Sequence, residues 1–157
     1  MIQRVQTIYL SLVVIMMILT FVFAHAVFSM NGEEAYSYFV HKIVSADASE
    51  IQPGNWLAQI GLIALISIVS IAAIASFKNR KRQVQLGNLN YLLLITFILS
   101  DYFSIKNMPM LFEGGEGLTT LYSYGFYFPV AALAFQFLAN RGIKKDEALV
   151  RSVERLR

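Results

Sequence analysis

The chain has 157 residues, of which 57% are hydrophobic and only 15% are charged, and its mean hydropathy is +0.56. A soluble domain of this length carries more charge on its surface, so the composition indicates an integral membrane protein. The chain has no cysteine, which excludes disulfides, thiolate metal sites and iron–sulfur clusters. The net charge of +3 does not indicate nucleic acid binding, because the basic residues gather where the chain would meet a membrane surface.

Four apolar segments are long enough to cross a bilayer, which takes about 20 helical residues. In chain order they cover residues 8–28, 56–77, 86–103 and 118–138. The predicted fold class is therefore all-α. It is a bundle of four transmembrane helices over residues 1–140, followed by a tail at 141–157 that forms a short amphipathic helix.

The links between these segments differ in charge. Of the 13 Lys and Arg residues, all but Lys42 and Lys106 lie in the N-terminal stub, the link after the second span, or the tail. Because basic residues are retained in the cytoplasm, both termini are predicted to be cytoplasmic. The basic link, KNRKRQVQ at residues 78–85, is predicted to be a tight turn between antiparallel spans.

The outer link at residues 29–55 contains a stretch of β-prone residues. This stretch, AYSYFVHKIV at 35–44, can form a short strand or hairpin on the outer surface. The alternation of apolar and polar residues fails at Phe39 and Val40, so the predicted fold class stays all-α.

Asp101 is the one carboxylate within a predicted span, and such residues are candidates for function. Counted along a helix it lies about 22 Å from Leu86, at the outer interface. His25 lies at a similar height on the first span, so a polar pair of His25 and Asp101 in the outer half is geometrically allowed. The simpler interpretation is that Asp101 meets water or caps a neighbouring helix.

The sequence predicts no metal, haem or other cofactor. One histidine and one carboxylate fall short of the usual three or four metal ligands, and His41 can add a third only if the outer link folds back over the bundle. No nucleophile–base pair, catalytic carboxylate pair or phosphate loop is present, so no enzymatic activity is predicted. Asn88, Asn90 and Gln136 are predicted to hydrogen-bond between helices.

The fourth span has aromatic residues in its outer half and a proline near its middle, Pro129. One interpretation is an aromatic-lined ligand site beside a helix kink. The other is an aromatic belt at the membrane interface together with a kink that serves packing.

The tail has the charge order of a helix. Asp146 and Glu147 lie near its start and basic residues near its end, which suits the helix dipole. Leu149, Val153 and Leu156 fall on one face, so the helix needs a surface to lie on. That surface can be anionic lipid, the basic turn of the same bundle, or another protein, and the mixture of acids and bases favours protein.

These arguments select a set of candidate lipid-binding or partner-binding residues on the cytoplasmic face. They are the charged residues of the stub, the basic link and the tail: Arg4, Lys78, Arg80, Lys81, Arg82, Lys144, Lys145, Asp146, Glu147, Arg151, Arg155 and Arg157.

Two terminal stretches carry a resemblance to a known family. MIQRVQTIYL at residues 1–10 and IKKDEALVRSVERLR at 143–157 resemble the ends of a family of four-span membrane proteins of Bacteroidota whose function is unknown, and LGNLNYLLL at 86–94 is also similar. The resemblance covers the whole chain and implies a location in the bacterial inner membrane. It implies no activity, cofactor or catalytic residue.

The function expected from the sequence is that of a small, non-enzymatic inner-membrane protein. It would be an accessory or structural subunit that contacts membrane lipid and docks other protein subunits through its cytoplasmic face. The alternative is a component of a transporter or channel that uses Asp101, His25 and the kinked fourth helix.

Overall fold

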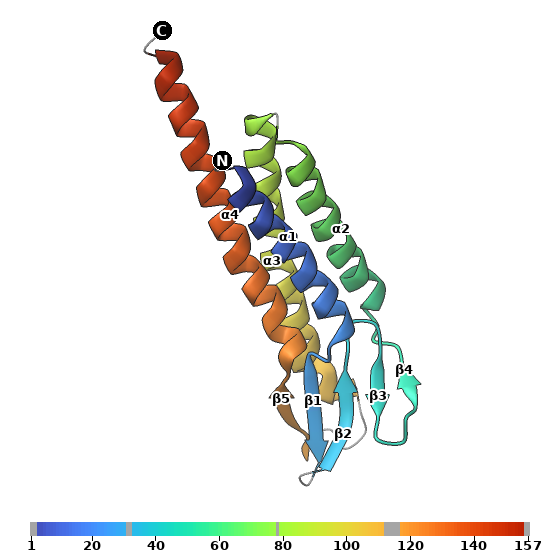
Figure 1. The fold of residues 1–157 in the computed structure, drawn as a ribbon. Coiled ribbons are helices and arrows are strands. Elements are labelled where there is room, and N and C mark those ends of the chain that lie inside the picture. The colour runs from blue at the N-terminus through green and yellow to red at the C-terminus, as the bar shows by residue number, and fades with distance from the viewer. Residues whose placement is uncertain (1–2, 31–32, 78, 112–116, 156–157) are drawn as a thin grey trace.

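The computed structural model describes residues 3–30, 33–77, 79–111 and 117–155, with side chains for 5–30, 33–77, 79–110 and 117–148. Four long helices in these ranges form an elongated bundle with a sheet at one end (Figure 1). We call this the sheet end. The opposite end, where the first helix begins and the last one finishes, is the terminal end. The helices are α1 (Gln3–Val22), α2 (Trp56–Ala75), α3 (Arg80–Asn107), the short 3-10 helix η1 (Met108–Leu111) and α4 (Tyr124–Arg155).

Five strands form an antiparallel sheet, so the prediction of an all-α fold is wrong. They are β1 (Ala26–Met30), β2 (Glu33–Tyr38), β3 (Ile43–Ser45), β4 (Glu50–Ile51) and β5 (Thr119–Tyr122), in the order β4-β3-β2-β1-β5. The first three residues of β1 and the whole edge strand β5 were predicted to be parts of membrane helices. Neither strand contains a charged residue, and their pairing joins segments about ninety residues apart, which no local pattern reveals.

The helix boundaries differ from the predicted ones for local reasons. α1 ends at Val22, and α4 begins at Tyr124 after β5. α3 takes in most of the predicted turn at 78–85, because Asn79 caps it: the Asn79 side chain accepts a hydrogen bond from the backbone N–H of Arg82 at 3.2 Å. The tail is not a separate helix, since α4 runs without interruption to Arg155.

Within the described residues, three helices are long and apolar enough to cross a membrane. They are Val5–Val22 of α1, Trp56–Ala75 and the α3 segment Arg80–Met110. These helices indicate a membrane protein. α4 is not in this set, because its second half is charged and its first half contains tyrosines and Gln136. The fourth span therefore stays a prediction.

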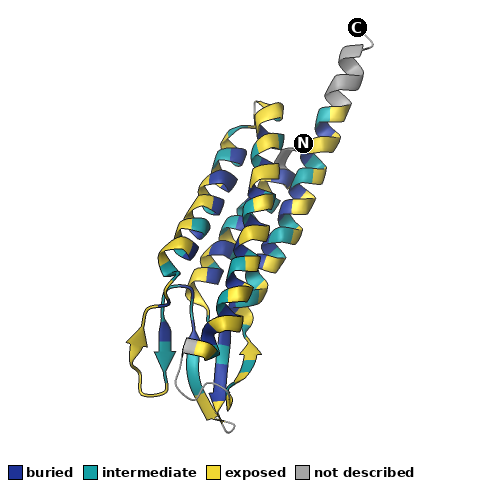
Figure 2. Ribbon diagram, turned by 180° about the vertical axis from the view of Figure 1, so that it is seen from behind, coloured by how far each residue is buried: buried dark blue, intermediate teal, exposed yellow. Residues whose placement is uncertain are grey.

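Buried positions recur along each helix at alternating spacings of three and four residues. On α1 they are Gln6, Leu10, Val13, Met17 and Thr20, and α3 and α4 repeat this pattern. Such spacing is typical of antiparallel bundles with left-handed packing. Figure 2 shows the result, in which buried and exposed positions alternate around each helix. The exposed positions are largely apolar, as on a surface that faces lipid.

The bundle core consists of polar levels separated by apolar ones. The main apolar cluster, between Asp101 and Asn90 along α3, contains Val13, Met17, Val40, Ile63, Ile66, Leu94, Phe97 and Ala132. A second cluster joins the sheet to the end of α3 and η1: Ala26, Phe28, Tyr38, Ile43, Ile105 and Met108. The sheet therefore closes one end of the bundle.

Candidate functional site

His25 and Asp101 form a buried pair at the sheet end. His25 lies in the link between α1 and β1 rather than on a helix, and its Nδ1 is 2.7 Å from Oδ2 of Asp101 on α3. Both side chains are 0% exposed. The interpretation in which Asp101 meets water is therefore wrong, because the sheet covers this end of the bundle.

The hydrogen bonds of His25 define its protonation. Nε2 is 2.8 Å from the backbone oxygen of Thr20, which can only accept, so Nε2 carries a hydrogen. This contact also satisfies a carbonyl in the last turn of α1 that has no partner within the helix. A single proton then lies between His25 Nδ1 and Asp101 Oδ2. Whichever atom holds it, the pair has no net charge, which suits a buried position.

The backbone around His25 connects four elements. The N–H of His25 donates to Tyr38 O at 2.7 Å, and its carbonyl accepts from Ser123 N at 2.9 Å. Two residues further, Gly125 N at the start of α4 donates to Ala24 O at 2.9 Å. We call His25, Asp101, Ala24, Tyr38 and Gly125 the junction. It joins the end of α1 to β2, α3 and α4.

The junction is tightly packed at Gly125. A Cβ placed on this residue would collide with the His25 ring and with the carbonyl oxygens of Phe23 and Ala24. The His25 ring also lies edge-on to that of Tyr38, with 6.2 Å between centroids. The glycine therefore allows the first turn of α4 to approach the His25 link closely.

More polar groups surround the junction. The side chains of Gln59 and Asn55 both donate to Ser104 Oγ, at 2.9 and 2.5 Å. Burial and then the charge of Asp101 raise the pKa of Tyr38 well above its usual range, so its hydroxyl stays protonated. Among the described side chains, Tyr38 Oη, Gln59 Oε1 and Asp101 Oδ1 are buried without a hydrogen-bond partner.

His41 lies apart from the pair of His25 and Asp101. Its ring stacks on Phe21 of α1 with 4.8 Å between centroids, and burial and the charge of Lys42 lower its pKa. Lys42 itself bonds Glu50 at 2.5 Å, which lowers the pKa of Glu50. In the part of the chain that is described, no three His, Asp or Glu side chains gather as metal ligands.

A second polar level crosses the middle of the bundle. Asn90 Nδ2 donates to Ser70 Oγ at 2.8 Å and to Gln136 Oε1 at 2.7 Å, so it joins α2, α3 and α4. Gln136 and Asn140 both donate to the backbone oxygen of Gly87, at 3.3 and 3.1 Å. The predicted contact between helices thus occurs at Asn90 and Gln136.

We expect Gln136→Leu to lower the free energy of unfolding by about 1–2 kcal/mol. The substitution removes one of the two acceptors of the Asn90 amide, so one of its N–H groups stays buried without a partner. Thermal unfolding in detergent measures the effect. Leu138→Ala on the exposed side of α4 is the control, and equal losses for the two variants would mean that this polar level does not hold the helices together.

A third polar level lies at the terminal end. Asp146 is 6% exposed, and its carboxylate accepts from Gln6 Nε2 at 2.5 Å and from Arg80 Nη1 at 3.2 Å. Between the tail and α1, Gly142 packs on the side chain of Gln6, and Ile143 is fully buried. The tail up to Asp146 is thus part of the bundle. Asp146 itself contacts Gln6 of α1 and Arg80 of α3.

The other predicted contact residues have varied positions. Arg80 is the partner of Asp146, and Glu147 is half-buried. Four basic residues of the predicted set are exposed at the terminal end: Lys81, Arg82, Lys144 and Lys145. Lys78 and Arg157 lie outside the described residues, and so do the side chains of Arg4, Arg151 and Arg155.

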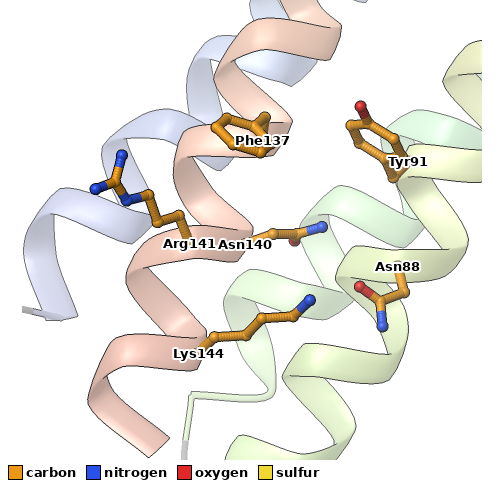
Figure 3. Close-up of a pocket in the computed structure, with 6 residues that line it drawn as sticks. All are labelled: Asn88, Tyr91, Phe137, Asn140, Arg141 and Lys144. Atoms are coloured by element: carbon orange, nitrogen blue, oxygen red, sulfur yellow. The ribbon is translucent and has the colours of Figure 1, made fainter. Parts of the chain in front are cut away.

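A groove runs between α3 and α4 in their terminal halves (Figure 3). Its volume is about 540 Å³, and its lining is Asn88, Tyr91, Phe137, Asn140, Arg141 and Lys144. Of these lining residues, only Lys144 was predicted from the sequence to belong to a binding surface. The signal that reveals the groove is the spacing of residues 137, 140, 141 and 144, which places them on one face of a helix.

Three of the helices are long and apolar enough to cross a membrane, a sheet closes one end of the bundle, and buried polar contacts join the helices. These features indicate a small, mostly helical membrane protein. Over residues 2–156 the chain matches the family described as Domain of unknown function (DUF4293), and it belongs to that family. No curated protein matches the chain. The resemblance of its two ends to a family of unknown function is thereby confirmed, while the Bacteroidota origin and the four spans stay predictions.

Proposed function

We propose that this protein is a non-enzymatic accessory subunit of a larger assembly in a bacterial inner membrane. In this proposal all four helices are embedded, both termini are cytoplasmic, and the end of α4 docks a protein partner. The observation that carries the proposal is the length of α4. Asp146 contacts Arg80 at the start of α3, and α4 continues beyond this level to Arg155 (Figure 1). That extension measures about 13 Å at 1.5 Å per residue.

The composition of this extension suits helix recognition. Its sequence includes Leu149 and Val153 four residues apart, flanked by Arg151, Glu154 and Arg155. A free helix of this length is marginal in water, but here it continues from an anchored one. A preformed amphipathic helix loses less entropy when it enters an apolar groove of a partner. Lys81, Arg82 and Lys145 are exposed at the same end of the bundle.

The alternative of a transporter or channel component has less support. Its polar groups would be His25 and Asp101 at one level and Asn90 at the next. Along α3 these levels are separated by Leu94 and Phe97, which belong to the main apolar cluster and are 0% exposed. The described core therefore offers no continuous polar route that would favour this function.

Two truncations test the docking proposal. A chain ending after Ala148 loses the extension but keeps Asp146 and its contacts, so we expect normal thermal stability and loss of the partner. A chain ending after Asn140 also loses the contacts of Gly142, Ile143 and Asp146, so we expect reduced stability as well. The measurement is co-purification from native membranes in mild detergent, followed by thermal unfolding.

The full chain should retain a partner in stoichiometric amount. If the full chain purifies alone, or if the chain ending at Ala148 keeps the partner, the docking proposal is wrong.

A further inference from the structure

We propose that the groove between α3 and α4 binds the phosphate-containing headgroup of an anionic phospholipid. This inference concerns a lipid site on the side of the bundle and does not depend on partner docking at the end of α4. It rests on the position of the groove along the bundle and on its lining, which is polar at one end and aromatic at the other. It also rests on basic side chains that have no acidic partner among the described residues.

The groove lies at the edge of the apolar part of the bundle. Asn140 reaches Gly87 O on α3, and two residues further along α4, Gly142 packs against Gln6. Gln6 adjoins Val5, where the apolar segment of α1 begins. The groove therefore spans the boundary at which a lipid headgroup meets its acyl chains.

The lining changes from polar to aromatic along the groove. In Figure 3 the Lys144 side chain extends from α4 towards Asn88 on α3, with the amide of Asn140 between the two helices. Phe137 and Tyr91 lie one turn further into the apolar part of the bundle. Ammonium and amide N–H groups bind phosphate oxygens, while the rings offer an apolar surface to an acyl chain.

The basic groups of the groove have no ion-pair partner within the part of the chain that the structure describes. Among the described residues, neither Arg141 nor Lys144 forms an ion pair, and the nearby carboxylate of Asp146 is bound by Arg80 and Gln6. Arg141 points towards α1 in Figure 3, so it adds charge at the rim while Lys144 points across the groove. The site is therefore complementary to an anion.

The shape of the groove favours a lipid over a small soluble anion. Its volume of about 540 Å³ exceeds what one phosphate fills and lies within the usual range for ligand sites. Phe137 is 54% exposed at the surface of α4. A soluble anion would gain nothing from this ring, whereas an acyl chain packs against it. Basic pockets between membrane helices at this depth are typical headgroup sites.

The test uses the full-length protein, delipidated in a neutral detergent. Phosphatidylglycerol should raise its unfolding temperature and phosphatidylcholine should not. In the double variant Arg141→Gln and Lys144→Gln, we expect the apparent affinity for phosphatidylglycerol to fall roughly ten-fold or more, with unfolding in the absence of lipid unchanged. The charge-matched control, Lys81→Gln with Lys145→Gln at the same end, should keep the response to phosphatidylglycerol.

Four results would overturn the proposal. Equal losses in both double variants would indicate a general charge effect, and no loss in the groove variant would place the lipid elsewhere. A stabilisation by inorganic phosphate equal to that by phosphatidylglycerol would indicate a soluble anion site. If the groove variant binds phosphatidylglycerol normally but loses a co-purifying protein, the groove is a protein contact.

Discussion

Replacement of Asp101 by alanine should lower the free energy of unfolding by about 3–5 kcal/mol, the largest effect we expect from a single side chain. The carboxylate is fully buried and is the partner of His25 Nδ1 at 2.7 Å. Without it, His25 keeps its contact with Thr20 but retains a second ring nitrogen with no partner in an apolar layer. Unfolding in detergent, followed by circular dichroism, measures the loss.

Asp101→Asn is the matched control for this change. An asparagine amide can donate a hydrogen bond to the Nδ1 of a neutral His25, so we expect a loss of only about 1–2 kcal/mol. A double-mutant cycle with His25→Ala should show strong coupling, because each single change already leaves the other residue unpaired. If Asp101→Asn lowers the free energy of unfolding as much as Asp101→Ala does, the pair does not stabilise the fold through a hydrogen bond.

The same cycle separates a structural pair from a functional one. If the protein retains its partner and its lipids in the Asp101→Asn variant, the pair serves to hold the sheet end together. If that variant is stable but loses a measurable flux in vesicles, the transport alternative gains the support that it now lacks.

Substitution of Gly125 by alanine should also destabilise the protein, by about 1–3 kcal/mol. The added methyl group would collide with the His25 ring and with two backbone oxygens. Backbone atoms cannot rotate away, so the first turn of α4 must shift from the link between α1 and β1. We expect a lower unfolding temperature and weaker protection of the Ser123 and Gly125 amides in hydrogen exchange, since both donate across this contact.

Gly61→Ala is the control, because nothing lies within 4 Å of a Cβ at that position on α2. An alanine inside a helix is favoured over glycine by roughly 0.5–1 kcal/mol, so this variant should be neutral or slightly more stable. If Gly125→Ala behaves like Gly61→Ala, the close approach at the junction does not constrain the fold.

The second helix was the element most accurately predicted from sequence. The predicted span at 56–77 corresponds to α2, Trp56–Ala75, because an uninterrupted apolar run of that length leaves few alternatives. The first and fourth spans were predicted with wrong ends, because neither the strand after α1 nor the strand before α4 contains a charged residue that would mark the end of the helix. One signal for the hairpin was present: the pair Asn31–Gly32 between two β-prone segments, a favoured sequence in two-residue turns.

The contact of His25 with Asp101 was predicted from their similar heights, although His25 was predicted to lie on a helix. The predicted height is still correct, because α1 ends at Val22 and the link to β1 stays at the same level. Gln6 was not predicted as a partner of Asp146, whereas Arg80 lies in the basic turn that was one of three surfaces proposed for the tail. The continuity of α4 with the bundle brings Asp146 to both residues.

The sequence by itself determined that the chain has long apolar helices and that its basic residues cluster at one end, because length and charge are local properties. Only the tertiary structure decided which side of each helix faces inwards. Exposed positions such as Leu92 are as apolar as core positions such as Leu94, so hydropathy cannot distinguish them. The strand pairing, the junction and the groove likewise depend on residues far apart in the chain, whose approach is set by packing of the whole bundle.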